Sequence, residues 1–181
     1  MTSHLTKEPP AASTESPGGR SADIGCIVTA DELRTLPQAL EKEWLVTNGI
    51  GGYASGSLAL LNSRRYHGLL VASLSPPGDR VLLVAKVDPV VEYLGQTYAL
   101  STNEFADGTL HPTGIRFLQS FRLEGLIPVW TFMIGDAVIE IRVWMHQGAN
   151  TSYVRYTLKQ ASAPVTMVLQ PLCTYRDIHS H

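Results

Sequence analysis

The chain has 181 residues, of which 44% are hydrophobic and 17% are charged, and its net charge is −2. This length predicts one domain with a full core. The near-neutral charge, and the lack of any apolar run close to the roughly 20 residues of a membrane span, exclude nucleic acid and membranes as expected partners.

The first 22 residues are rich in Ser, Thr, Pro, Gly and Ala, and this composition predicts a disordered leader. A first short strand is expected at "IGCIV", from Ile24. Thr29 and Glu32 then have the spacing of a capping box. They predict one short N-terminal helix, opposed by Pro37, with the apolar residues Leu33, Leu36 and Leu40.

From Trp44 onward the hydrophobic period is two, which is typical of strands. "RVLLVAKVDPVVEYLGQTYAL" predicts a long strand with a bend at Asp88-Pro89 and a turn at Gly95-Gln96. "PVWTFMIGDAVIEIRVWM" predicts a hairpin that turns at Gly135-Asp136. "SYVRYTLKQ" and "PVTMVLQPL" add two strands, so residues 23–181 are expected to form an all-β, antiparallel β-sandwich.

Two further features bear on the context of the chain. Cys26 and Cys173 lack metal-site spacing and are expected to be buried, reduced thiols in a cytoplasmic protein. The last predicted strand runs into "CTYRDIHSH" without a closing strand or helix, so we expect the chain to be part of something larger.

A glycine-rich stretch, "EWLVTNGIGGYASGS" at residues 43–57, contains the spacing G-x-G-x-x-A of dinucleotide-binding loops. That interpretation fails because too little chain follows for a crossover helix and a second parallel strand, and no acidic residue lies near residues 69–73. A phosphate-binding P-loop fails because no Gly-Lys-Ser/Thr closes the stretch. A tight structural corner and a neutral sugar site both remain open.

The next motif, "RRYHG", would as a strand place Arg64 and Tyr66 on one face, with Arg65 and His67 on the other. One arginine would then enter an interface, where it could either cap backbone carbonyls or contact a ligand. His67 is interpreted as a hydrogen-bonded structural histidine. No nucleophile has a recognisable base partner, and Asp177, His179 and His181 make too weak a pattern for a metal, so neither a metal nor a cofactor is predicted.

Taken in order, these two motifs and the later "YRDIH" resemble the N-terminal domain of bacterial and archaeal-type glycogen debranching enzymes. The resemblance is close over residues 43–74 and looser as far as His181. It implies a supersandwich-like β-sandwich packed on a C-terminal (α/α) toroid with amylo-α-1,6-glucosidase activity. It also implies substrate-binding or domain-interface positions at Asn48, Gly49, Gly51, Gly52, Tyr53, Ser55, Arg64, Arg65, Tyr66, His67, Tyr175, Arg176 and Asp177.

Glycoside hydrolysis needs two carboxylates, and the motifs contain only Glu43 and Asp177, so we assign no catalytic residue. The chain is instead expected to be the scaffold and substrate-side wall of a debranching enzyme, with an α-glucan and the toroid as partners. One alternative is an autonomous α-glucan-binding module that stacks sugars on Trp44, Tyr53, Tyr66 or Trp130. Another is a purely structural module.

Overall fold

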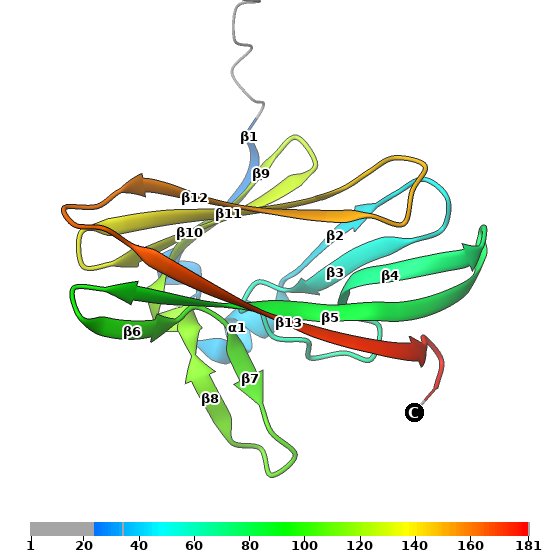
Figure 1. Ribbon diagram of the computed structural model, residues 1–181, viewed down its shortest axis with the longest axis horizontal. Helices are drawn as coiled ribbons and strands as arrows, with labels where there is room; N and C mark the ends of the chain where they lie inside the picture. Colours follow the sequence, from blue (N-terminus) through cyan, green and yellow to red (C-terminus); the bar gives the residue numbers. More distant parts are fainter. Residues whose placement is uncertain (1–23, 34, 181) are drawn as a thin grey trace, which may run out of the picture.

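The computed structural model describes residues 24–33 and 35–180 as two antiparallel sheets packed face to face (Figure 1). The predicted all-β, sandwich-like architecture is therefore confirmed. The leader predicted for residues 1–22 lies outside the described residues.

One sheet has the strand order β1-β9-β10-β11-β12. Its strands are β1 Ile24–Thr29, β9 Leu118–Glu124, β10 Ile127–Ile134, β11 Ala137–Met145 and β12 Ser152–Gln160. The predicted hairpin turn is confirmed, since Ile134 pairs with Ala137 across Gly135-Asp136.

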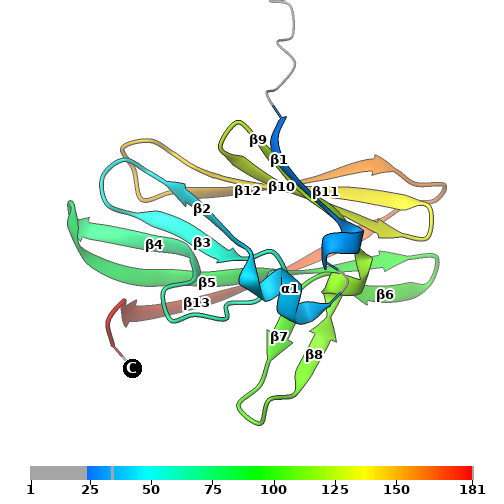
Figure 2. The same cartoon turned by 180° about the vertical axis from the view of Figure 1, so that it is seen from behind.

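The other sheet has the order β13-β5-β4-β3-β2, and β6 pairs with β5 outside this path. Its strands are β2 Glu43–Thr47, β3 Tyr53–Ser57, β4 Gly68–Ser75, β5 Gly78–Tyr93, β6 Gln96–Ala99 and β13 Thr166–Asp177. A hairpin of β7 Thr102–Glu104 and β8 Leu110–Thr113 projects away from both sheets (Figures 1 and 2).

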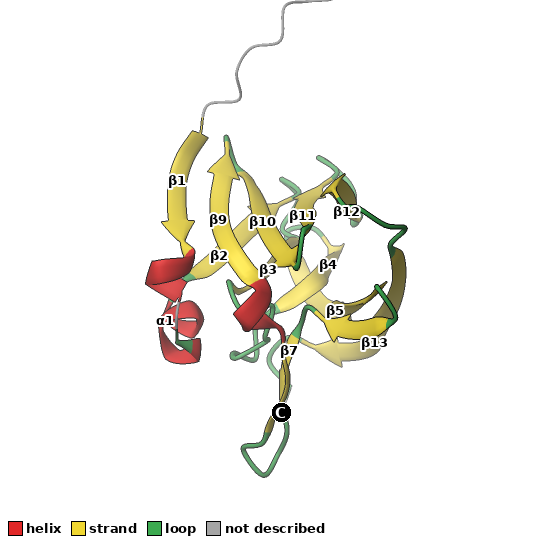
Figure 3. Ribbon diagram, turned by 90° about the vertical axis from the view of Figure 1, so that its left-hand side faces the viewer, coloured by secondary structure: helices red, strands yellow, loops and turns green. Residues whose placement is uncertain are grey.

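The one short N-terminal helix expected from the sequence is confirmed, but Thr29 does not open it. Thr29 does pair with Glu32, whose carboxylate accepts the Thr29 N–H at 2.9 Å, but this closes only the 3₁₀ turn Ala30–Leu33. The α-helix α1, Leu36–Glu41, has its own capping box from Thr35 and Gln38. Pro37 lies in its first turn, where a missing N–H costs nothing. A second 3₁₀ turn, Gly114–Phe117, precedes β9, and Figure 3 shows α1 beside β1 at one side of the sandwich.

Strand β5 continues through Asp88 and Pro89 instead of bending there as expected. On one edge, Val84 is the last residue paired with β4 and Val90 is the first paired with β6. Pro89 lies between these two ladders, so its missing N–H removes no hydrogen bond on that edge.

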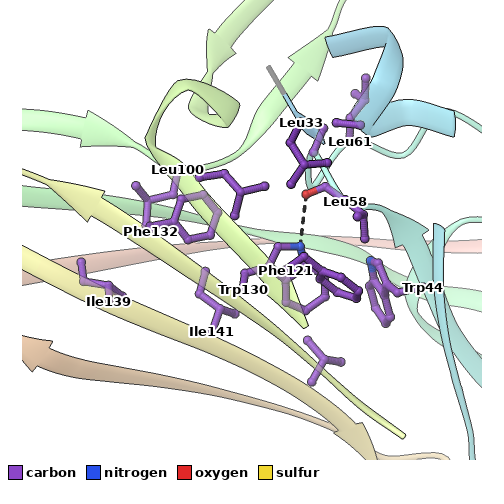
Figure 4. Close-up of a cluster of buried hydrophobic side chains, with 14 of the residues drawn as sticks. Leu33, Trp44, Leu58, Leu61, Leu100, Phe121, Trp130, Phe132, Ile139 and Ile141 are labelled. Atoms are coloured by element: carbon purple, nitrogen blue, oxygen red, sulfur yellow. Dashed lines mark hydrogen bonds between the residues drawn. The ribbon is translucent and has the colours of Figure 1, made fainter. Parts of the chain in front are cut away.

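The core between the sheets is centred on Trp130, which is fully buried on β10 (Figure 4). Its ring makes edge contacts with Trp44, at 5.3 Å between centroids, and with Phe121, at 5.2 Å. Its indole N–H donates to the carbonyl of Leu58 at 3.1 Å. Trp130 thus joins the two sheets through both apolar packing and one buried hydrogen bond.

The alternation predicted for β11 holds on the core side, where Ile139, Ile141 and Val143 are buried. On the outer side, however, Glu140 is also buried. The guanidinium groups of Arg122 and Arg142 cover it, and Nη2 of Arg122 lies 2.6 Å from its Oε1. Pairing with arginine allows this carboxylate to lose solvent contact.

Both cysteines are exposed free thiols, so the expectation that they are buried is wrong. Cys26 lies on β1 and Cys173 on β13, and each strand is the edge of its sheet. Most of β13 is exposed, Cys173 included, and among the described side chains of β1 only Val28 is buried.

Replacing Trp130 by alanine should lower the free energy of unfolding by about 3–5 kcal/mol, because a large buried ring and a buried hydrogen bond are lost together. The half-buried Trp144 stacks on Tyr153, at 5.3 Å between centroids, and the Arg155 guanidinium lies 5.9 Å from the centre of its ring. Trp144→Ala is the matched control and should cost about 1 kcal/mol. Urea unfolding followed by circular dichroism measures both, and equal losses would contradict the central position given to Trp130.

Candidate functional site

The glycine stretch forms the loop between β2 and β3, at residues 48–52, and Asn48 organises it. Its Oδ1 accepts the N–H groups of Ile50 (3.1 Å) and Gly52 (2.9 Å). Its Nδ2 donates to the carbonyl of Ala149 and to Oδ1 of Asn150, both at 3.1 Å. Asn48 is fully buried, and it ties this loop to the one between β11 and β12 in the opposite sheet.

The glycines are needed by this corner for steric reasons. Gly49 and Gly51 have φ of +77° and +101°, values that residues with a side chain rarely adopt. A Cβ at Gly51 would lie 2.5 Å from the carbonyl oxygen of Pro77, and one at Gly52 would lie 2.5 Å from Nδ2 of Asn48. The loop joins two antiparallel strands, which confirms the exclusion of a dinucleotide-binding crossover.

The "RRYHG" motif is a turn and not a strand, so the predicted alternation of Arg64 and Tyr66 against Arg65 and His67 is wrong. The N–H of His67 donates to the carbonyl of Arg64 at 3.0 Å, and β4 begins only at Gly68. The polar and amphipathic side chains of residues 64–67 are compatible with a turn as well as with an edge strand. The hydrogen bond from His67 back to Arg64 stabilises the turn.

His67 is held inside this turn, and its side chain is 4% exposed. Its Nδ1 accepts the N–H of Arg64 at 3.3 Å, so in the neutral ring Nε2 carries the proton and donates to Oε1 of Glu43 at 3.1 Å. Nε of Arg64 lies 2.5 Å from the same carboxylate oxygen. Burial lowers the pKa of His67, and the Glu43 carboxylate only partly opposes this.

The C-terminal motif folds back against the turn. Arg176 donates from Nη2 to the carbonyl of Arg65 at 2.8 Å, and Arg65 donates from Nη1 to the carbonyl of His179 at 2.8 Å. The ring of His179 lies edge-on to Tyr66, at 5.9 Å between centroids. The main-chain N–H of His179 donates to Oδ1 of Asp177 at 2.8 Å. These two arginines therefore cap backbone carbonyls, one of the two roles left open by the sequence.

Strand β3 contributes the side chains of Tyr53 and Ser55 to the cluster. The hydroxyl of Tyr53 donates to the carbonyl of Tyr66 at 3.0 Å, and Ser55 donates to the same carbonyl at 3.4 Å. Burial raises the pKa of Tyr53. Ile178 is 2% exposed and packs on Val71 and on Leu82 of the same sheet. Three segments distant in sequence thus meet on the face of this sheet that points away from the core.

The structure does not bring all predicted residues into this cluster. Asn48 and the three glycines lie in the loop that precedes Tyr53, where Asn48 bonds to its own loop and to Ala149 and Asn150 instead of to the cluster. The side chain of Tyr175 is 76% exposed. Of the aromatic residues suggested for sugar stacking, Trp44 and Trp130 are buried in the core and cannot serve. Tyr66, 44% exposed, remains accessible.

An open hollow of about 510 Å³ lies beside the glycine loop and includes three residues that the sequence did not single out. It is lined by Leu45, Thr47, Gly49, Gly51, Gly52, Tyr53 and Arg80. Arg80 reaches it from β5, where its Nε donates to the carbonyl of Gly51 at 2.7 Å. Leu45 and Thr47 alternate with the buried Trp44 and Val46 along β2. Because Trp44, Leu45 and Val46 are all apolar, no sequence pattern marked this outward face.

The acidic residues of the motifs are engaged separately, Glu43 by Arg64 and His67 and Asp177 by a main-chain N–H. Within residues 24–33 and 35–180, no group of three or more His, Cys, Asp or Glu side chains could hold a metal ion. His181 lies outside this part. No helix of the described chain is long and apolar enough to cross a membrane.

Comparison with known proteins gives one match. Residues 42–181 match the family described as "Glycogen debranching enzyme N terminal". No curated protein and no solved structure matches the chain. The matched region begins just before β2 and therefore contains the whole site.

Replacing Asn48 by alanine should lower the free energy of unfolding by about 3 kcal/mol, because buried N–H groups of Ile50 and Gly52 lose their acceptor. Asn62 makes one half-buried bond, from Nδ2 to the carbonyl of Ala85 at 2.8 Å, so Asn62→Ala is the matched control and should cost about 1 kcal/mol. Urea denaturation compares the two variants, and a loss for Asn48→Ala no greater than the control's would refute the organising role.

His67 should make stability depend on pH. Above about pH 6.5 the imidazole is neutral in both the folded and the unfolded chain. Below that value the unfolded chain takes up the proton first, because burial lowers the pKa in the folded state. The free energy of unfolding should therefore fall as the pH drops below about 6.5, until it passes the folded-state pKa.

The measurement is urea unfolding at several pH values from about 8 to about 5, for the natural chain and for His67→Gln, which keeps a donor but does not titrate in this range. Below about pH 6.5 the free energy of unfolding should fall less steeply in His67→Gln than in the natural chain. His111→Gln, at an exposed histidine, is the control and should keep the natural profile. If both variants behave alike, His67 is not responsible.

Proposed function

Since this chain belongs to the glycogen debranching enzyme N-terminal family, we propose that it is the scaffold and substrate-side wall of an amylo-α-1,6-glucosidase. In this proposal a C-terminal (α/α) toroid supplies the catalytic carboxylates, and an α-glucan such as glycogen or a limit dextrin is the substrate. The outer face of the β2–β5 sheet, where the three motifs meet, is the surface turned toward the toroid and the glucan.

The observation that carries the proposal is the meeting of three motifs on one exposed face. Their side chains are fixed by bonds to backbone atoms: Arg176 and Arg65 donate to carbonyls, and Tyr53 donates to the carbonyl of Tyr66. A surface held in this way changes little when it meets a partner, which favours a preformed docking face. The exposed Tyr66 and the hollow beside Tyr53 lie on the same side of the sheet.

The acidic residues support a wall in preference to a catalyst. Hydrolysis of a glycosidic bond needs one carboxyl group as an acid and a second as a base or nucleophile. Glu43 is in an ion pair with Arg64, and Asp177 accepts a hydrogen bond from its own turn. Each carboxylate has its own separate partners within this chain, so the proposal places the catalytic pair in the toroid.

Two exposed tyrosines favour a second candidate, an autonomous α-glucan-binding module without catalysis. Tyr66 and Tyr175 present accessible rings on which a sugar can stack. Co-sedimentation of the chain with glycogen, and its loss in Tyr66→Ala, would support this candidate. We also propose a cytoplasmic location, in keeping with two free thiols and no disulfide among the residues described.

The proposal predicts that this chain alone releases no glucose from a limit dextrin, whereas the chain joined to the sequence that follows it in its gene does. The measurement is enzymatic detection of glucose from both proteins. Glucose release by the chain alone would contradict the proposal that this chain is a wall and that the toroid is the catalyst. A joined sequence without a toroid domain would contradict it as well.

In the joined enzyme, Arg176→Ala should lower kcat/KM by up to about thirtyfold, since two hydrogen bonds of about 1 kcal/mol each hold the motif turns together. Those bonds run from Arg176 to the carbonyls of Arg65 and Ser180. Arg116→Ala, at an exposed arginine near β9, is the matched control and should leave kcat/KM unchanged.

A further inference from the structure

The hollow beside the glycine loop has unused hydrogen-bonding groups of one kind. The N–H groups of Gly49 and Gly51 donate to no acceptor among residues 24–33 and 35–180, whereas those of Ile50 and Gly52 are taken by Asn48. Arg80 uses only Nε, toward Gly51, so its two terminal nitrogens have no hydrogen-bond or ion-pair partner in the described chain. Residues that line the hollow therefore carry several unused donors.

The rest of the lining is apolar or neutral. Leu45 is 61% exposed, and Thr47 lies directly opposite Tyr53 in the β2–β3 ladder. Residues directly opposite one another in a ladder share a face, and Leu45 and Thr47 are two apart on one strand, so these three side chains point the same way. The glycines leave the rim without side chains, which keeps the hollow open at about 510 Å³. The hollow is an open depression of the surface and does not enclose a ligand, so a sugar would lie on it with one side in solvent.

We propose that this hollow binds one glucosyl unit of an α-glucan, a step that rests on the proposed function and adds a specific subsite to it. A pyranose has an apolar C–H face, which suits Leu45 and the edge of Tyr53. It also has a rim of hydroxyl oxygens, which suits the N–H groups of Gly49, Gly51 and Arg80. Thr47 adds one hydroxyl.

Charge favours a neutral sugar over an anion. Only one guanidinium group reaches the hollow, so an anion would lose part of its hydration on Leu45 and Tyr53 without meeting a second cation. A neutral ligand that bears hydroxyl groups meets no such cost. Inorganic phosphate is therefore the competing ligand that the experiment must distinguish.

The test is a titration of the ¹⁵N-labelled chain with maltotriose, followed by the amide signals of Gly49 and Gly51. Both signals should shift and saturate, with a dissociation constant in the millimolar range. Leu45→Ala should weaken binding by about fivefold to tenfold, because the apolar contact is lost. Leu126→Ala is the matched control, since Leu126 is 85% exposed on the turn between β9 and β10 and should leave binding unchanged.

A second variant, Thr47→Trp, fills the hollow without touching the core, and it should abolish the shifts while leaving the remaining spectrum folded. Shifts that fail to saturate, or that inorganic phosphate reproduces in place of maltotriose, would overturn the inference. If maltotriose leaves the amides unmoved while the joined enzyme still debranches, the subsite fails and the proposed function stands. If the amides move but the joined enzyme is inactive, the proposed function fails and the subsite stands.

Discussion

One buried amide, that of Asn48, decides how the two sheets meet at the site. Its oxygen accepts two N–H groups of its own loop, and its nitrogen donates to Ala149 and Asn150 in the opposite sheet. Asn150 passes the link on, since its Nδ2 donates to the carbonyl of Ser73 at 2.8 Å. The β2–β3 loop, the β11–β12 loop and β4 are therefore held by a single connected network, in which the loss of one member leaves buried groups unpaired.

The motif residues consequently divide into two groups with different physical roles. The side chain of Asn48 is fully engaged in the hydrogen bonds of the corner. Gly51 and Gly52 cannot carry a side chain there, because a Cβ would lie 2.5 Å from a neighbouring atom at each position. The guanidinium groups of Arg65 and Arg176 are engaged with backbone carbonyls. That of Arg176 is planar and donates to the carbonyls of two turns at once. What remains available to a partner is Tyr66, Tyr175 and the lining of the hollow.

The sequence predicted most of the fold because local signals sufficed for it. The β10–β11 hairpin follows from two β-rich runs around Gly135-Asp136. The outward face of β2 could not be predicted in this way, because Trp44, Leu45 and Val46 are three apolar residues in a row. The site was less predictable. The "RRYHG" turn has no glycine or proline before Gly68, so alternation misread it as a strand. The partners of Asn48 are about a hundred residues away, and no local pattern encodes such a contact.

Arg80 shows most clearly why residue type alone did not identify the hollow. It follows "SPPGD", which predicts only a turn, and no residue close to it in the sequence indicates a hydrogen-bond partner for its side chain. Its position becomes meaningful once β4 and β5 pair and bring it across to the carbonyl of Gly51. Asn48 accepts the N–H groups of Ile50 and Gly52, whereas those of Gly49 and Gly51 have no acceptor in the described part of the chain. The interaction that builds the corner therefore also creates the unused donors beside it, and fold and candidate binding site have one physical origin.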